Sequence, residues 1–138
     1  MRLVSTAGAA LMMAAVACGP KTPPVSPSLD AREWSLVDLK DKPPPMGAGG
    51  RPATIHFDTA AHRASGFAGC NRYSAQYTAA GDSLTFGPAM ATKMACSDGD
   101  ALEREFFAVL PDVTGFQLAD TSLTLSGAAG PLARFRAP

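Results

Sequence analysis

The sequence has little that marks nucleic-acid-binding proteins or metalloproteins. Lys and Arg together number 12, Asp and Glu also number 12, and no run of basic residues occurs. Because binding to a phosphate backbone depends on clustered cations, we expect no nucleic-acid partner. The only histidines are His56 and His62, and no Cys-x-x-Cys pair is present. We therefore expect no metal site and no cofactor.

A recognisable catalytic constellation is missing as well. Ser, His and Asp all occur, but not in a Gly-x-Ser-x-Gly or other nucleophile setting. Glu103 and Glu105 lie close together on one predicted helix surface, whereas acid–base carboxylates face each other across a cleft. The sequence therefore predicts a protein that is not an enzyme.

The N-terminal apolar run is too short to cross a membrane comfortably. Arg2 supplies one positive charge, and residues 3–17 are uncharged and rich in Ala, Leu, Met and Val. A span needs about 20 residues, whereas a charged start followed by a short apolar run is typical of a secretion signal. We assign residues 1–17 to a signal peptide.

The end of this run resembles the lipobox of bacterial lipoproteins. Residues 15–19 read Ala-Val-Ala-Cys-Gly, and in a lipobox the Cys is lipidated and becomes the first mature residue. We expect lipidation of Cys18 and a Pro-rich tether over residues 18–32. The alternative is an ordinary signal with an incidental Cys. The residue after Cys18 is Gly19 and not Asp. By resemblance to the sorting rule of enterobacterial lipoproteins, this favours the outer membrane, with the domain facing the periplasm.

Residues 33–138 have the pattern of a small β-rich domain. Short segments of alternating hydrophobicity are separated by Gly and Pro, which predicts antiparallel strands joined by turns. The predicted strands cover residues 33–39, 54–57, 63–68, 73–78, 83–86, 116–118, 123–125 and 132–136. Residues 40–53 contain three consecutive prolines and three glycines, so we expect a loop there. Such strands predict a strongly curled antiparallel sheet that forms an open, barrel-like structure.

One segment has helical periodicity instead. Its apolar stripe consists of Leu102, Phe106, Val109 and Leu110. Asp100 and Glu103 have the spacing of a capping box, and Pro111 disfavours continuation of the helix. With one helix beside the sheet, the predicted fold class is α+β.

Cys70 and Cys96 lie in the predicted domain. In an exported protein an even pair predicts a disulfide, which would contribute about 3–4 kcal/mol by closing the intervening loop. A redox-active pair and a metal thiolate site stay open as alternatives.

The segments around these cysteines resemble the META domain, also called the HslJ-like family. Residues 65–77 contain a Gly-Cys-Asn-Arg-Tyr turn, and residues 90–96 read Met-Ala-Thr-Lys-Met-Ala-Cys. Both motifs stand in that family's order and spacing. Residues 34–36 resemble its opening and residues 123–125 its closing hairpin, so the resemblance covers residues 33–136. It implies a curled antiparallel sheet with one helix. It also implies envelope lipoproteins linked to heat shock and novobiocin tolerance, without an established enzymatic activity.

Asn71 and Arg72 form the candidate interaction surface, together with the loop at residues 40–53. Asn71 either contacts a ligand or caps the backbone of its turn, and Arg72 either belongs to a recognition patch or is a solvated strand-edge residue. Met90 and Met94 are expected in the core.

These observations together predict a lipid-anchored, non-enzymatic interaction or stress-related module of the cell envelope. The lipid anchor makes the membrane its first partner, and another envelope protein or a small amphiphile is a candidate for a further one. The competing interpretation is a thiol-redox protein or enzyme that uses Cys70 and Cys96.

Overall fold

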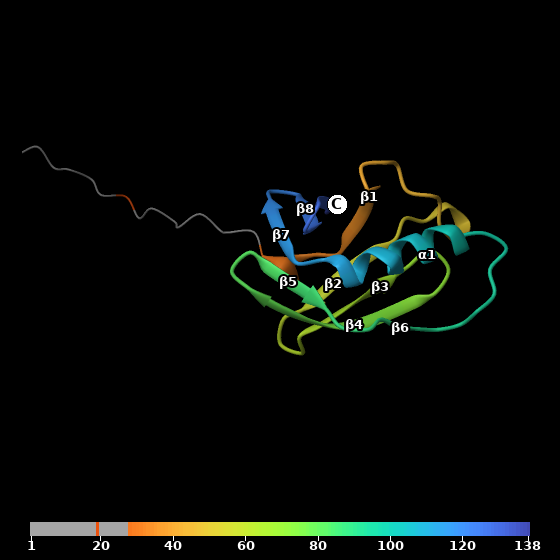
Figure 1. The fold of residues 1–138 in the computed structure, drawn as a ribbon, viewed down its shortest axis with the longest axis horizontal. Coiled ribbons are helices and arrows are strands. Elements are labelled where there is room, and N and C mark those ends of the chain that lie inside the picture. The colour runs from red at the N-terminus through yellow and green to blue at the C-terminus, as the bar shows by residue number, and fades with distance from the viewer. Residues whose placement is uncertain (1–18, 20–27) are drawn as a thin grey trace, which may run out of the picture.

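The structure, a computed structural model, describes Gly19 and residues 28–138 (Figure 1). The predicted signal peptide and Cys18 lie outside the described residues. The strands are β1 (Trp34–Leu39), β2 (Thr54–Asp58), β3 (Arg63–Phe67), β4 (Arg72–Ala80), β5 (Ser83–Phe86), β6 (Met90–Ala91), β7 (Gly115–Ala119), β8 (Ser122–Gly127) and β9 (Gly130–Arg136). The helix α1 covers Asp100–Val109, and short 3-10 turns cover η1 (Leu29–Ala31), η2 (Ala48–Gly50) and η3 (Leu110–Asp112).

All strand pairs are antiparallel, and the sheet closes on itself. The order of hydrogen-bonded neighbours is β3-β2-β1-β9-β8-β7-β5-β4-β6, and β3 also pairs with β4. That hairpin completes a ring of eight strands, because β6 only extends the side of β4 through residues 73–74. The α+β class with a curled sheet, one helix and one disulfide is confirmed. The sheet closes further than the open form expected from the sequence.

Alternation along the strands decides which residues face the interior. In β2, Ile55 and Phe57 are fully buried while His56 is exposed, as the sequence predicts. In β4, Tyr73 and Tyr77 are buried on the inner face. Successive side chains of a strand point to opposite faces, so Ser74 and Gln76 of β4 lie on the outer face of the barrel.

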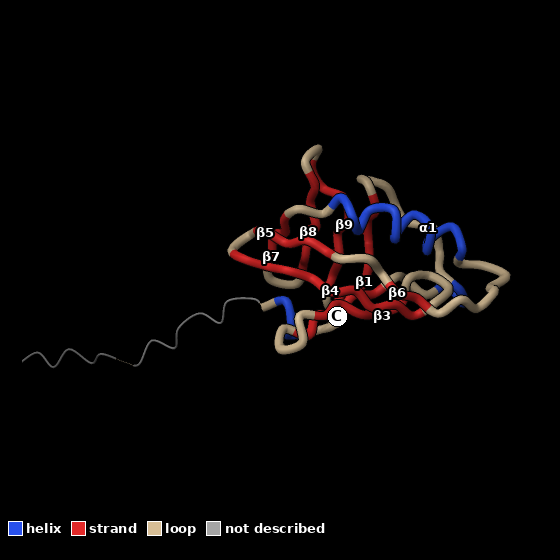
Figure 2. The backbone as a smooth tube through the Cα atoms, turned by 60° about the horizontal axis from the view of Figure 1, so that its bottom comes forward, coloured by secondary structure: helices blue, strands red, loops and turns tan. Residues whose placement is uncertain are grey.

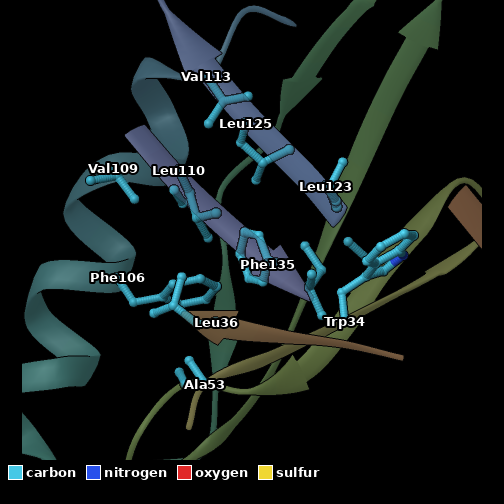
Figure 3. Packing of buried hydrophobic residues seen from close by; sticks show 14 of the residues in the cluster. Trp34, Leu36, Ala53, Phe106, Val109, Leu110, Val113, Leu123, Leu125 and Phe135 are labelled. Atoms are coloured by element: carbon cyan, nitrogen blue, oxygen red, sulfur yellow. The ribbon is translucent and has the colours of Figure 1, made fainter. Parts of the chain in front are cut away.

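Figure 2 shows the helix α1 lying against the curled sheet. The helix buries the apolar stripe that the sequence predicts. Leu102, Phe106 and Val109 are fully buried. Figure 3 shows Phe106 directed towards Phe135 of β9, and the two ring centroids are 6.4 Å apart. Phe106 also contacts Tyr73, with 5.3 Å between the ring centroids. The helix is therefore part of the core, which also includes Trp34, Phe57 and Leu84.

The predicted capping box is not formed. Gly99 is the residue before the helix, with a φ of 94°, and no side chain caps the first turn. Asp100 is the first helical residue, and the carboxylate of Glu103 is instead bonded to the turn between β3 and β4. The left-handed conformation at Gly99 suits a glycine, which carries no Cβ.

The folded part reaches back to Leu29, before the expected start at Glu33. Leu29 is buried, and its carbonyl oxygen accepts a hydrogen bond of 3.1 Å from Nε1 of Trp34. The core cluster runs from Leu29 to Ala137, so a chain starting at Gly19 contains every residue of this core. Among the residues described here, no helix is both long and apolar enough to cross a membrane.

Candidate functional site

Cys70 and Cys96 form a disulfide, with 5.9 Å between their Cα atoms. The bond joins the turn between β3 and β4 to the segment that precedes α1. The predicted pairing is confirmed. Within the described part of the chain, no group of three or more His, Cys, Asp or Glu side chains has the arrangement of a metal site.

Asn71 is buried beside this disulfide, with 4% of its surface exposed. Its Oδ1 accepts hydrogen bonds from the backbone N of Met94, at 2.8 Å, and from Oγ1 of Thr92, at 3.1 Å. Its Nδ2 donates to Oε1 of Glu103, at 3.0 Å. The side chain thus joins three segments that are distant in sequence instead of capping its own turn. It is not available to a partner at the surface.

Glu103 binds the other side of the same turn. Its Oε2 accepts hydrogen bonds from the backbone N of Asn71, at 2.6 Å, and from the backbone N of Cys70, at 3.2 Å. A carboxylate that accepts hydrogen bonds from backbone N–H groups makes strong, charge-assisted contacts. Glu103 therefore fastens α1 to the turn. Sequence reasoning placed it on a helix surface, because nothing local indicates a partner 32 positions away.

The loop after β1 is fixed at both ends and free in the middle. Its second half is fixed because the backbone N of Ala48 donates to the carbonyl oxygen of Gly69, at 2.6 Å. In the same half, the guanidinium of Arg51 lies 4.0 Å from the centre of the Phe67 ring. Its first half lines a pocket together with Leu39 and Glu105. Residues 40–42 are fixed as well, because the backbone N of Lys40 donates to the carbonyl oxygen of Leu132, at 2.8 Å, and Leu39 and Lys42 exchange backbone hydrogen bonds. Only residues 43–45 are therefore a candidate for a movable binding loop.

Four exposed residues near Asn71, on β4, β6 and the segment that follows β6, make up what we call the β4–β6 surface. It consists of Arg72, Met90, Lys93 and Met94, all of them exposed. The methionines were expected in the core, and that expectation is wrong, because Met90 is 76% exposed and Met94 65% exposed. Met90 pairs with Ser74, which lies between the inward-facing Tyr73 and Ala75. Residues paired across an antiparallel ladder share a face, so Met90 lies on the outside of the barrel.

The backbone under this surface is held in place. The backbone N of Thr92 donates to the carbonyl oxygen of Arg72, at 3.1 Å, and Met94 is bonded to Asn71. The disulfide at Cys96 fixes the end of the segment. A shallow hollow lies between the two strands, and its lining includes Arg72, Ser74 and Met90.

The buried polar groups near the surface are occupied within the protein. Burial raises the pKa of Tyr73 well above its usual range, so the hydroxyl stays neutral, and it donates to the carbonyl oxygen of Thr54 at 2.9 Å. Within the described residues, no buried side-chain nitrogen or oxygen lacks a hydrogen-bond partner. We call the hydrogen-bonded group of Asn71, Thr92, Met94 and Glu103 the Asn71 junction. Its polar side chains bind one another, so the groups left to contact other molecules are the exposed cations and thioethers of the β4–β6 surface.

A second, apolar hollow lies beyond the end of α1. Its lining includes Phe86, Pro88, Phe107 and Pro111. Its apolar lining is suited to a small amphiphile.

Comparison with known proteins gives a family match and three structural neighbours. The META domain family matches residues 27–138. Comparison with curated proteins gives no match. An NMR structure of a protein from Burkholderia xenovorans is similar, with 28% identity and a TM-score of 0.63; the match covers 89% of this chain and 99% of that one.

The other two neighbours share the fold at lower identity. A second NMR structure has 22% identity and a TM-score of 0.60, covering 79% of this chain and 91% of that chain. A crystal structure of a DUF4847 family protein from Bacteroides vulgatus has 15% identity and a TM-score of 0.55, covering 78% and 93%.

Proposed function

The chain belongs to the META domain family, and from this premise we propose that it is a lipid-anchored, non-catalytic module of the bacterial cell envelope. In this proposal its β4–β6 surface meets a partner. The main support for this surface is the contrast between it and the buried residues beside it. The polar side chains of the Asn71 junction satisfy one another, whereas the cations and methionines of the surface point outward from a backbone that the junction fixes.

Two features support export and anchoring. Cys18 stands where the apolar run ends, and a Pro-rich stretch separates it from a core that begins at Leu29. The Cys70–Cys96 disulfide suits an oxidising compartment such as the periplasm. Several acyl chains on Cys18 would hold the domain at the membrane durably, whereas one chain binds only marginally. Gly19 favours the outer membrane as the site of attachment.

The arrangement of the titratable groups supports a non-catalytic role. An active site usually combines a concave pocket with titratable groups that converge on it. Here Glu103 and Tyr73 are directed into hydrogen bonds within the protein. The stress-related role that the family resemblance implies belongs to this proposal, as does a partner that is another envelope protein or a small amphiphile in the apolar hollow.

A thiol-redox function is the second candidate, favoured by the accessibility of the disulfide. Cys96 is only half-buried, so a small thiol can approach one of the two sulfur atoms. Against it, the bond helps to hold the segment that carries Met94. Cleavage would therefore disturb the surface that the first proposal uses.

Site-specific crosslinking in intact cells tests the interaction. A photoreactive residue at Met90 should capture a neighbour, whereas the same residue at Gln117, exposed on β7, should not. Equal capture from both positions, or capture from Gln117 alone, would rule out the β4–β6 surface as the contact.

A further inference from the structure

We infer that the β4–β6 surface docks directly onto an anionic lipid bilayer, with Met90 and Met94 against the acyl region and Arg72 and Lys93 near the headgroup phosphates. This inference rests on the proposed function. It deepens that function by naming the membrane itself as a partner of the folded domain, in addition to the lipid on Cys18.

The surface combines two kinds of side chain that favour a membrane interface. Scattered exposed apolar residues are normal on a soluble domain. Here, however, two exposed methionines flank Lys93 within one short segment, and that segment is bonded to Arg72. Flexible apolar side chains beside cations are the composition of interfacial membrane-binding elements. The long stems of Arg and Lys also allow their charges to reach phosphates while the backbone stays above them.

Neither of the two cations forms an ion pair with another residue that the structure describes. Among the described residues, both ion pairs are formed by Arg134, with Asp38 and with Asp41. The carboxylate of Glu103, which lies under the surface, is turned inward to Cys70 and Asn71. Asp98 and Asp100 follow beyond the disulfide, at the start of α1. Arg72 and Lys93 are therefore free to bind anions, and each cation near an anionic membrane strengthens binding about fivefold.

The fixed backbone lowers the entropic cost of docking. The segment from Thr92 to Cys96 is already ordered by Asn71 and the disulfide, so binding need not freeze a loop. The proposed anchor also keeps the bilayer close. Ten residue steps separate Cys18 from Ser28 and can span at most about 35 Å. A weak surface is sufficient at such a high effective concentration.

Vesicle binding by the unlipidated chain tests the inference. The chain starting at Gly19 contains the whole core and has no Cys18, so any binding comes from the folded domain or its tether. It should sediment with vesicles of phosphatidylglycerol and phosphatidylcholine but not with phosphatidylcholine alone. Salt at about 1 M, where the Debye length is only about 3 Å, should release it. Absence of binding to the anionic vesicles would overturn the inference.

Two double variants separate the surface from the tether. The charge reversal Arg72→Glu with Lys93→Glu should weaken binding to the anionic vesicles about 25-fold or more, since each of the two cations contributes about fivefold. The pair Met90→Gln and Met94→Gln keeps side-chain length but removes the apolar contact, and should weaken binding as well. The matched controls are Arg136→Glu, an exposed cation on β9, and Val37→Thr, an exposed apolar residue on β1.

All of the altered side chains are exposed, so the thermal midpoints should stay close to that of the parent chain. Unchanged vesicle binding in both double variants would overturn the inference. If the double variants keep their vesicle binding but lose crosslinking to an envelope protein, the inference is also overturned. The partner of the surface would then be an acidic protein. Because the chain in this test has no Cys18, absence of vesicle binding would not count against lipid anchoring. Likewise, evidence against lipid anchoring at Cys18 would not change the result of the vesicle test.

Discussion

Nδ2 of Asn71 lies 3.0 Å from Oε1 of Glu103, which links the turn between β3 and β4 to the helix α1. The same asparagine binds the backbone of Met94 through Oδ1, so one buried side chain ties the helix, the turn and the segment after β6 together. The outward-facing β4–β6 surface depends on this link.

Asn71→Ala should destabilise the domain by about 2–3 kcal/mol, because partners of the amide would be left buried without hydrogen bonds. Chemical denaturation measures the change in the free energy of unfolding. Gln76→Ala on β4, the strand that follows the turn, is the control, because Gln76 is exposed, and it should change stability by under about 0.5 kcal/mol. Equal effects at the two positions would show that the Asn71 link does not hold the junction.

Removal of the disulfide with Cys70→Ala and Cys96→Ala should cost about 3 kcal/mol and lower the thermal midpoint by several degrees. A structural bond of this kind should have a reduction potential below about −300 mV, out of reach of the glutathione pool. Equilibration with glutathione and thiol counting measures it. A potential in the range of the thiol oxidoreductases, with little effect of the double substitution on stability, would favour the redox function instead.

Phe106→Ala should cost about 3–5 kcal/mol, since the ring is fully buried between Tyr73 and Phe135. The adjacent Phe107 is only half-buried and gives a matched control, so Phe107→Ala should cost clearly less. Urea denaturation of both variants provides the comparison. A loss under about 1 kcal/mol at Phe106 would mean that the helix is peripheral to the core.

Gly47→Ala should destabilise the domain by about 1–3 kcal/mol, the usual cost of overpacking. A Cβ at this position would stand 2.3 Å from the carbonyl oxygen of Arg51. By contrast, replacing residues 43–45 with Gly and Ser should leave the thermal midpoint nearly unchanged, since these residues form none of the backbone hydrogen bonds that hold the rest of the described loop. If the linker unfolds the domain and Gly47→Ala does not, the division of the loop into the free residues 43–45 and a fixed remainder is wrong.

Periodicity along the chain predicted most of the strands, the helix stripe and the inward-facing tyrosines, because burial on one face of an element leaves a local repeat. The pairing of Cys70 with Cys96 followed from the small number of cysteines in an exported chain. The link between Asn71 and Glu103 had no such signal, since it joins residues 32 positions apart.

The exposed methionines were misread for a different reason. Hydrophobic residues were expected to be buried, but β6 pairs with β4 over only two residues, so it gives no alternation from which a face can be inferred. The closed ring was likewise not predicted from the sequence, because the number of strands in a barrel depends on long-range pairing.

Metabolic labelling with a palmitate analogue tests the anchored-module account most directly. The full-length chain should incorporate the label and fractionate with membranes, and Cys18→Ser should abolish the label. The Cys70→Ser and Cys96→Ser double variant should still be labelled, since those residues form the disulfide and carry no lipid. Label that persists in Cys18→Ser, or a parent chain without label, would contradict lipid anchoring at Cys18.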